Sequence, residues 1–223
     1  MSERDILKAI VDDDCPSAKR LLQENPSLAT LRIGEARLYE TRIFHWIYVG
    51  DTPLHLAAAG YRVEIIQLLL AAGADPNSSL NHRQSGPLHY AADTCLTSPA
   101  WSARKQIETI RYLLKAGAKI NAPDKTGATP LHRAVRTRGA EAVKFLLKAG
   151  ADPLLKNKPG STPFHLAVQN TGRGGSGSDT AKAAQRQIIQ EFLSHGIAPH
   201  IKDGKGKAVL DCAQSDWIRA MLR

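Results

Sequence analysis

One short phrase occurs four times in this chain of 223 residues, and the repetition limits the possible folds more than any other feature. In each copy a proline and an apolar residue precede a histidine, and an alanine stands two residues after that histidine. An apolar pair and a closing glycine follow later. Such repetition predicts a stack of small structural units, each too small to fold alone. The copies are Thr52-Pro53-Leu54-His55, Gly86-Pro87-Leu88-His89, Thr129-Pro130-Leu131-His132 and Thr162-Pro163-Phe164-His165.

The copy at Thr129 shows what one unit contains. Thr129 can cap a helix, and Pro130 fits the first helical position because an N–H there would have no partner within the helix. A second amphipathic helix is expected over residues 141–148, and Gly150 after it can adopt the positive φ that ends many helices. One helix pair cannot bury its own apolar face, so neighbouring pairs must stack.

The phrase Thr-Pro-Leu-His followed by alanine resembles the signature of the ankyrin repeat. The resemblance extends over almost the whole chain and implies an all-α fold: an ankyrin-repeat solenoid of stacked antiparallel helix pairs with β-hairpin-like connecting loops. It also implies that the signature histidines hydrogen-bond within and between the repeat turns, and that loops and first helices form a concave binding surface. Proteins of this family usually bind other proteins and are not enzymes. The signature histidines are His55, His89, His132 and His165.

The spacing of the signatures divides the chain into two terminal caps and four interior repeats. We expect a single ankyrin-repeat domain over residues 1–223. Its expected parts are an N-terminal cap repeat (1–31), an extended finger insertion (32–49), four repeats (50–85, 86–126, 127–159 and 160–205) and a C-terminal cap (206–223).

The first connecting loop is about 15 residues longer than its counterparts and is rich in aromatic and β-branched residues, which predicts an extended β-hairpin. Such a finger either packs on the first repeats or grips a partner. Two more insertions fall inside repeats, between the paired helices: one at residues 95–104, and a glycine- and serine-rich one at residues 171–179 that has the composition of a flexible linker. The aromatic residues of the finger are Tyr39, Phe44, Trp46 and Tyr48.

The sequence shows no pattern for catalysis or for a cofactor. Cys15, Cys95 and Cys212 lie far apart without metal-ligand spacing, and no nucleophile motif accompanies any histidine. The glycine-rich insertion lacks the Gly-Lys-Ser/Thr ending of a phosphate-binding loop. We therefore expect no enzyme activity, no catalytic residue, no metal and no cofactor.

Positive charge is concentrated in the middle of the chain. The formal net charge is +9, and residues 103–158 hold 13 Lys and Arg against 4 Asp and Glu. This excess predicts a protein partner with an acidic surface. A solvated face that only keeps the chain soluble is one alternative, and binding of nucleic acid or acidic phosphate groups through the basic middle repeats is another. Nucleic acid is disfavoured because no stacking aromatic residues are interleaved with these charges.

The function predicted from the sequence is therefore a non-catalytic protein–protein interaction scaffold, with a partner that the sequence does not identify. No secretory signal or membrane-spanning run is visible, so a cytoplasmic location is expected, although delivery elsewhere would leave no trace in the sequence. The sequence does not specify the oligomeric state. The expected partner-binding residues are Tyr39, Phe44, Trp46 and Tyr48 on the finger, and Tyr90, Lys125, Arg133, Arg136 and Lys158 along the concave side.

Overall fold

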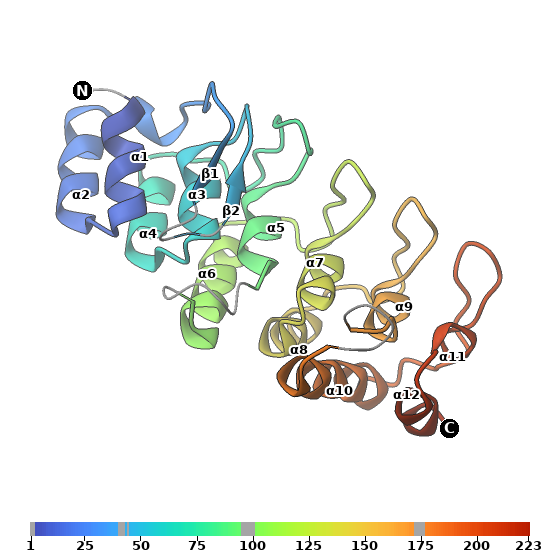
Figure 1. Ribbon diagram of the computed structural model, residues 1–223. Coiled ribbons are helices and arrows are strands. Elements are labelled where there is room, and N and C mark those ends of the chain that lie inside the picture. Colours follow the sequence, from blue (N-terminus) through green and yellow to red (C-terminus); the bar gives the residue numbers. More distant parts are fainter. Residues whose placement is uncertain (1–2, 40–42, 44, 95–100, 172–176) are drawn as a thin grey trace. The chain divides into compact units, whose positions relative to one another are not determined.

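A computed structural model describes residues 3–39, 43, 45–94, 101–171 and 177–223 of the chain. Helices make up most of the regular structure, and loops join one helix pair to the next (Figure 1). The chain divides into two compact units. The first unit is Met1–Lys125 and the second unit is Thr126–Arg223.

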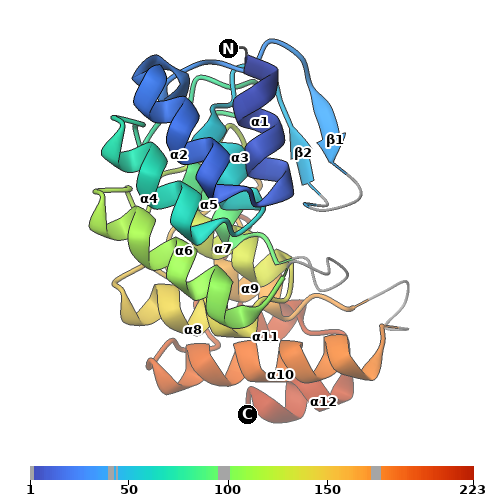
Figure 2. The ribbon, with the colours of Figure 1, turned by 90° about the vertical axis from the view of Figure 1, so that its left-hand side faces the viewer.

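The first unit is built from three helix pairs in two layers. Helices α1, α3 and α5 pack side by side in one layer, and α2, α4 and α6 form the other layer (Figure 2). Each pair contributes one helix to each layer, which is the stacking that the signature predicts. The helices are α1 (Glu3–Asp12), α2 (Cys15–Glu24), α3 (Pro53–Ala59), α4 (Val63–Ala71), α5 (Pro87–Ala92) and α6 (Ala103–Lys115), with a short 3₁₀ helix η1 (Pro26–Ala29) after α2.

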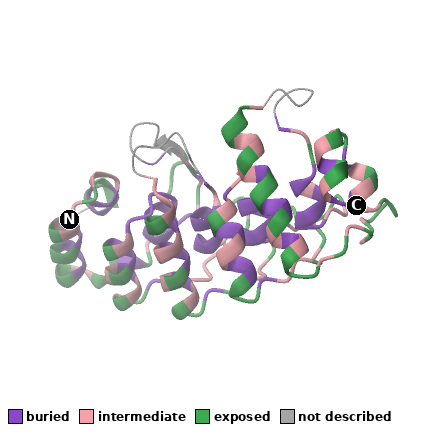
Figure 3. Cartoon of the chain, turned by 90° about the horizontal axis from the view of Figure 1, so that it is seen from below, coloured by how far each residue is buried: buried purple, intermediate pink, exposed green. Residues whose placement is uncertain are grey.

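Helices α3 and α5 are buried on all sides, whereas α4 and α6 bury one face and expose the other (Figure 3). Ala57 and Ala91, the alanines that follow the signature histidines, are fully buried. Small side chains at these positions let α3 and α5 approach each other closely. Arg62 ties the first pair to the second, because its guanidinium donates to the carbonyl oxygens of Ile10 and Val11 at the end of α1.

The long first connection forms the predicted hairpin. Strand β1 (Arg37–Tyr39) pairs antiparallel with β2 (His45–Ile47), so that Tyr39 lies opposite His45. The pairing continues beyond the strands, because the N–H of Ile33 donates to the carbonyl of Asp51 at 2.7 Å. Strand β2 contacts α3, and Ile47 is completely buried. The hairpin is therefore anchored on the first layer of the first unit.

The second unit repeats the same pattern. Its α7 packs on α8 and α9, α8 packs on α10, and α9 also contacts α10 and α11. Phe164 and Phe192 stack between α9 and α10 with their ring centres 4.8 Å apart. The helices are α7 (Pro130–Arg136), α8 (Ala140–Lys148), α9 (Pro163–Ala167), α10 (Asp179–Ser194), α11 (Val209–Cys212) and α12 (Asp216–Met221).

The two later insertions join the helices of a pair, α5 to α6 and α9 to α10. Residues 95–100, which include Cys95, and residues 172–176 lie outside the described residues. In the described part of the chain, no helix is both long enough and apolar enough to cross a membrane.

Candidate functional site

Three of the signature histidines, His55, His132 and His165, hold neighbouring repeat turns together through bonds between loops. In His55 the ring Nδ1 accepts from the N–H of Thr52 at 3.0 Å, and Nε2 donates to the carbonyl of Ser85 at 2.9 Å. His132 makes the same bond to Ser161, at 3.0 Å. Burial lowers the pKa of His55 below its usual value, which favours the neutral ring. These rings are structural, as the resemblance implies.

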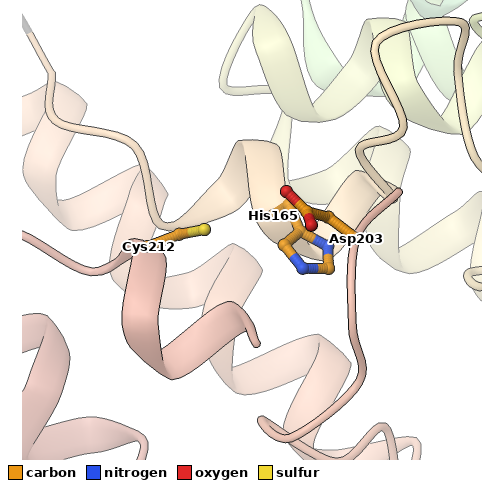
Figure 4. Close-up of side chains that lie close together, drawn as sticks. All are labelled: His165, Asp203 and Cys212. Atoms are coloured by element: carbon orange, nitrogen blue, oxygen red, sulfur yellow. The ribbon is translucent and has the colours of Figure 1, made fainter. Parts of the chain in front are cut away.

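His165, Asp203 and Cys212 lie close together in the second unit, with one possible ligand atom each within 4.8 Å of the others (Figure 4). The Nε2 of His165 donates to the carbonyl of Lys207 at 3.1 Å, and its Nδ1 bonds the hydroxyl of Thr162 at 2.8 Å. Both ring nitrogens are thus engaged as in the other turns. We conclude that this cluster closes a loop and is not built to hold a metal ion.

The side chain of Asp203 has its own structural role. Its Oδ1 accepts from the backbone N–H groups of Lys205 and Lys207, at 2.8 and 2.9 Å. These bonds hold the pKa of Asp203 below its usual value. Burial raises the pKa of Cys212, which favours the thiol over the thiolate.

A groove of about 250 Å³ lies beside Gly86 in the first unit. Among the described residues, its lining includes Ser79, His89 and Lys119 but no carboxylate and no thiol. The Nδ1 of His89 accepts from the N–H of Gly86 at 3.1 Å, which is again the turn bond of the signature. This nitrogen of His89 therefore serves the turn and is not available as a base.

The inserted hairpin is fixed to the first unit by polar groups. His45 Nε2 lies 3.1 Å from the carboxylate of Asp93, and the His45 ring lies against the ring of Tyr90 with centres 4.7 Å apart. Asp51, at the base of the hairpin, is completely buried. It accepts from the N–H of Tyr48, the amide of Asn81 and the hydroxyl of Tyr90, at 2.7, 2.6 and 2.8 Å. A buried carboxylate with three donors is stable and fixes the finger rigidly.

The outer side of this finger carries exposed apolar groups. Trp46 is 49% exposed and Val49 is 52% exposed. Tyr48 lies under the guanidinium of Arg83, whose Nη1 donates to the tyrosine hydroxyl at 3.1 Å. Leu80, on the next loop, is 72% exposed. We call these five residues the aromatic finger surface.

Backbone contacts hold the loops of this surface together. A Cβ on Gly50, next to Val49, would lie 2.7 Å from the carbonyl oxygen of Leu80, so the first and second loops touch at that point. The N–H of Lys125 donates to the carbonyl of Arg83 at 2.8 Å, and this bond joins the third loop to the second. The side chain of Lys125 is exposed beside them. The first unit thus presents apolar, aromatic and cationic groups on a fixed frame.

The sequence-predicted site residues fall into different places. Trp46 and Tyr48 belong to the aromatic finger surface, Tyr39 contributes backbone pairing in β1, and Phe44 lies outside the described residues. Lys125 is exposed in the first unit, whereas Arg136 and Lys158 are exposed in the second unit.

Two expected binding residues are buried, and the expectation that they face a partner is wrong. Tyr90 is 1% exposed because its hydroxyl bonds Asp51 and its ring packs on His45. Arg133 is 4% exposed. Helix α7 is so short and closely packed that every residue from Pro130 to Val135 is buried, and only its last residue, Arg136, is exposed.

Sequence reasoning missed three exposed lysines on the last loop of the second unit. They stand in the loop before α11, and their positions relative to the signature could have revealed them. Counting charge over long blocks of sequence concealed them, because residues 159–223 carry only a small net excess. The missed residues are Lys202, Lys205 and Lys207.

Comparison with known proteins gives a consistent picture. A family model described as ankyrin repeats (3 copies) matches residues 6–124 and 100–203. Alpha-latrotoxin-Lhe1a of Latrodectus hesperus is 38% identical over 88 residues, which are 39% of this chain and 6% of the toxin. Ankyrin repeat domain-containing protein 53 of Macaca fascicularis is 35% identical over 89 residues, 40% of this chain and 17% of that protein.

A third relative is the ankyrin repeat and KH domain-containing protein mask-1 of Caenorhabditis elegans. It is 34% identical over 93 residues, which are 42% of this chain and 3% of that protein. The matched region therefore spans a small fraction of each relative, and the likeness concerns the repeats.

Proposed function

Because the chain belongs to the ankyrin-repeat family, whose repeats are generally protein–protein interaction modules and generally not catalytic, we propose that it binds a partner protein through the aromatic finger surface of its first unit. Repeats of this kind present a surface that is already formed before binding. A rigid surface reduces the conformational entropy lost on association. The inserted hairpin enlarges that surface.

The half-exposed indole of Trp46 carries the proposal. Tryptophan and arginine are enriched among the residues that dominate binding energy, and their effect is greatest when apolar neighbours exclude water. Trp46, Val49 and Leu80 are exposed on the first two loops, and Arg83 lies stacked on Tyr48. Strand β2 holds Trp46 away from the core, because its neighbour Ile47 points inward.

The anchoring of the hairpin also supports a binding role. His45, Asp51 and Asp93 fix its base through hydrogen bonds, while Trp46 leaves half of its surface exposed. An exposed tryptophan on a fixed finger costs solubility and adds little stability to the fold. A partner that covers it accounts for its presence.

A capture experiment tests the proposal. Three immobilised baits are incubated with cell lysate: the full wild-type chain, the Trp46→Ala variant and the Tyr112→Ala variant. Tyr112→Ala is a matched control, because it removes a partly exposed aromatic ring from α6. We expect Trp46→Ala to lose at least one protein that the wild-type chain retains, and Tyr112→Ala to keep it. Circular dichroism melting confirms that both variants are folded. Equal recovery of all proteins by the three baits would overturn the proposal.

A further inference from the structure

Two loops of the second unit lie in direct contact at their tips. The N–H of Gly204 donates to the carbonyl of Gly160 at 2.8 Å. A Cβ on Gly160 would lie only 2.7 Å from the Cα of Gly204, so glycine is required for this approach. The two loops therefore present their side chains as one surface. We call Leu154, Lys156, Lys158, Lys202, Lys205 and Lys207 the lysine loop surface.

The lysines of this surface outnumber Asp152 and Asp203, the carboxylates of the same two loops. The side chains of all five lysines are exposed. Asp203 between them is bound to the N–H groups of Lys205 and Lys207, and Asp211 accepts from the N–H of Ala208 at 2.9 Å. Among the described residues, no lysine of this surface forms an ion pair with a carboxylate, and the Nζ of Lys156 donates to the carbonyl of Asp203.

The second unit as a whole has the same bias. Its sequence holds 15 Lys and Arg against 7 Asp and Glu, whereas the first unit holds 15 against 14. Concentrated positive charge raises the rate at which an acidic partner is captured and disfavours basic partners. The charge excess of the chain is thus mainly a property of the second unit.

We infer that the lysine loop surface binds an acidic protein segment that carries an aliphatic side chain. The carboxylates of the segment would lie against Lys158, Lys205 and their neighbours, and its aliphatic side chain against Leu154. Leu154 is 53% exposed, two residues before Lys156, and its N–H is fixed by Asp152 at 2.8 Å. The inference rests on the proposed protein-binding function and adds a second docking surface with a stated partner chemistry.

The same observations disfavour a phosphate-bearing ligand. A phosphate site usually offers several converging backbone N–H groups. Here the N–H groups of Lys205 and Lys207 already donate to Asp203, so these two groups do not converge on a phosphate. Stacking of nucleic-acid bases needs aromatic side chains, and the lysine loop surface contains none. An exposed leucine among lysines matches an acidic and aliphatic peptide better.

Fluorescence anisotropy with designed peptides tests the inference. The probe is a labelled peptide of alternating glutamate pairs and leucines. Three comparison ligands are the same peptide with glutamine for glutamate, the same peptide with alanine for leucine, and an oligothymidylate of similar net charge. The full chain is titrated at low and at physiological salt. We expect the acidic leucine peptide to bind most tightly, and salt to weaken it by screening.

Two variants with equal loss of charge locate the binding site. Lys158→Gln with Lys205→Gln removes two charges from the lysine loop surface while keeping their backbone bonds. Lys148→Gln with Lys182→Gln removes two charges from helices α8 and α10 of the same unit. We expect the first pair to weaken peptide binding about tenfold and the second pair to leave it nearly unchanged. Leu154→Ala should weaken only the leucine peptide, by about threefold.

Three outcomes of these titrations would overturn the inference. Wild-type chain that does not bind the peptide, equal weakening by both lysine pairs, or tighter binding of the oligothymidylate would each do so. The Trp46→Ala variant separates this inference from the proposed function, since it should bind the peptide as the wild-type chain does. Loss of protein capture in Trp46→Ala with normal peptide binding leaves both proposals standing, whereas capture that is unaffected by Trp46 removes only the proposed function.

Discussion

The first and last connecting loops of this chain are both held in a fixed conformation, but by different kinds of interaction. The first, which contains the hairpin, is held by buried side chains: Asp51 bonds Tyr48, Asn81 and Tyr90 inside the first unit. The last is held by its own backbone and by one partly exposed aspartate, Asp203. A long insertion needs buried side chains to hold it in place, and those side chains cannot then contact a partner. A short loop leaves its side chains available.

The largest expected effect comes from removing the anchor of the first loop. Asp51→Ala removes the acceptor shared by the Tyr48 N–H, the Asn81 amide and the Tyr90 hydroxyl, and we expect the free energy of unfolding to fall by about 3 kcal/mol. The matched change in the last loop, Asp203→Ala, should cost only about 1 kcal/mol because its donors are exposed to water. Urea denaturation of both variants measures the difference. Equal losses would remove the contrast between the loops.

Glycine substitutions probe the contact between the loops of the second unit. Gly160 has a φ of +90°, and an added Cβ would meet Gly204. Gly150 has a φ of +93° but open space around it. We expect Gly160→Ala to destabilise the chain by about 2 kcal/mol, from strain and collision, and Gly150→Ala by about 1 kcal/mol, from strain alone. Thermal melting shows whether the first loss exceeds the second.

The neutral histidine beside Asp51 gives the first loop a pH dependence. The pKa of His55 is lowered in the folded chain by burial, so between its ordinary value of 6.5 and its folded value the unfolded chain binds more protons. Stability from this residue is complete above pH 6.5 and decreases as the pH falls toward the folded pKa. The loss is at most about 1.4 kcal/mol per pH unit. Urea denaturation from pH 7 down to about 5.5 tests this window, and constant stability across it would contradict the prediction.

The smallest effect is a gain in stability at the second signature turn. Gly86 stands where the other copies have threonine, and its φ of −83° suits any residue. A Cβ there would lie 3.7 Å from the carbonyl oxygen of Ser78, an ordinary contact. Gly86→Thr would supply the hydroxyl that Thr52 gives to His55, and we expect a gain of about 0.5 kcal/mol. A lower melting temperature would show that the turn has no room for it.

The sequence predicted the repeating parts well because their positions are repeated. Four copies of one phrase predicted the helix pairs and the buried alanines, the family resemblance implied the bonds of the signature histidines, and the aromatic run predicted the hairpin. Local pattern could not show which side of a short helix is covered. Tyr90 follows a signature histidine and meets Asp51 from a distant loop, which only the packed structure reveals.

Exposure of charge was also hard to predict. Arg133 and Arg136 stand one turn apart on α7, yet the first is buried and the second exposed. The lysines of the last loop are separated by only a few residues, but their common surface depends on the contact of Gly204 with Gly160. The net charge of a long block of sequence does not show which lysines share a surface. Aligning the sequence of one loop with that of the next shows which lysines occupy equivalent positions.

Lys205 and Lys207 contribute only main-chain groups to the closure of the last loop: the N–H groups of both residues, and the carbonyl of Lys207. The shape of that loop is consequently insensitive to which side chains these two positions carry. Other residues could be introduced at both positions to redirect binding toward a different ligand, with little change in the folding of the repeats beneath.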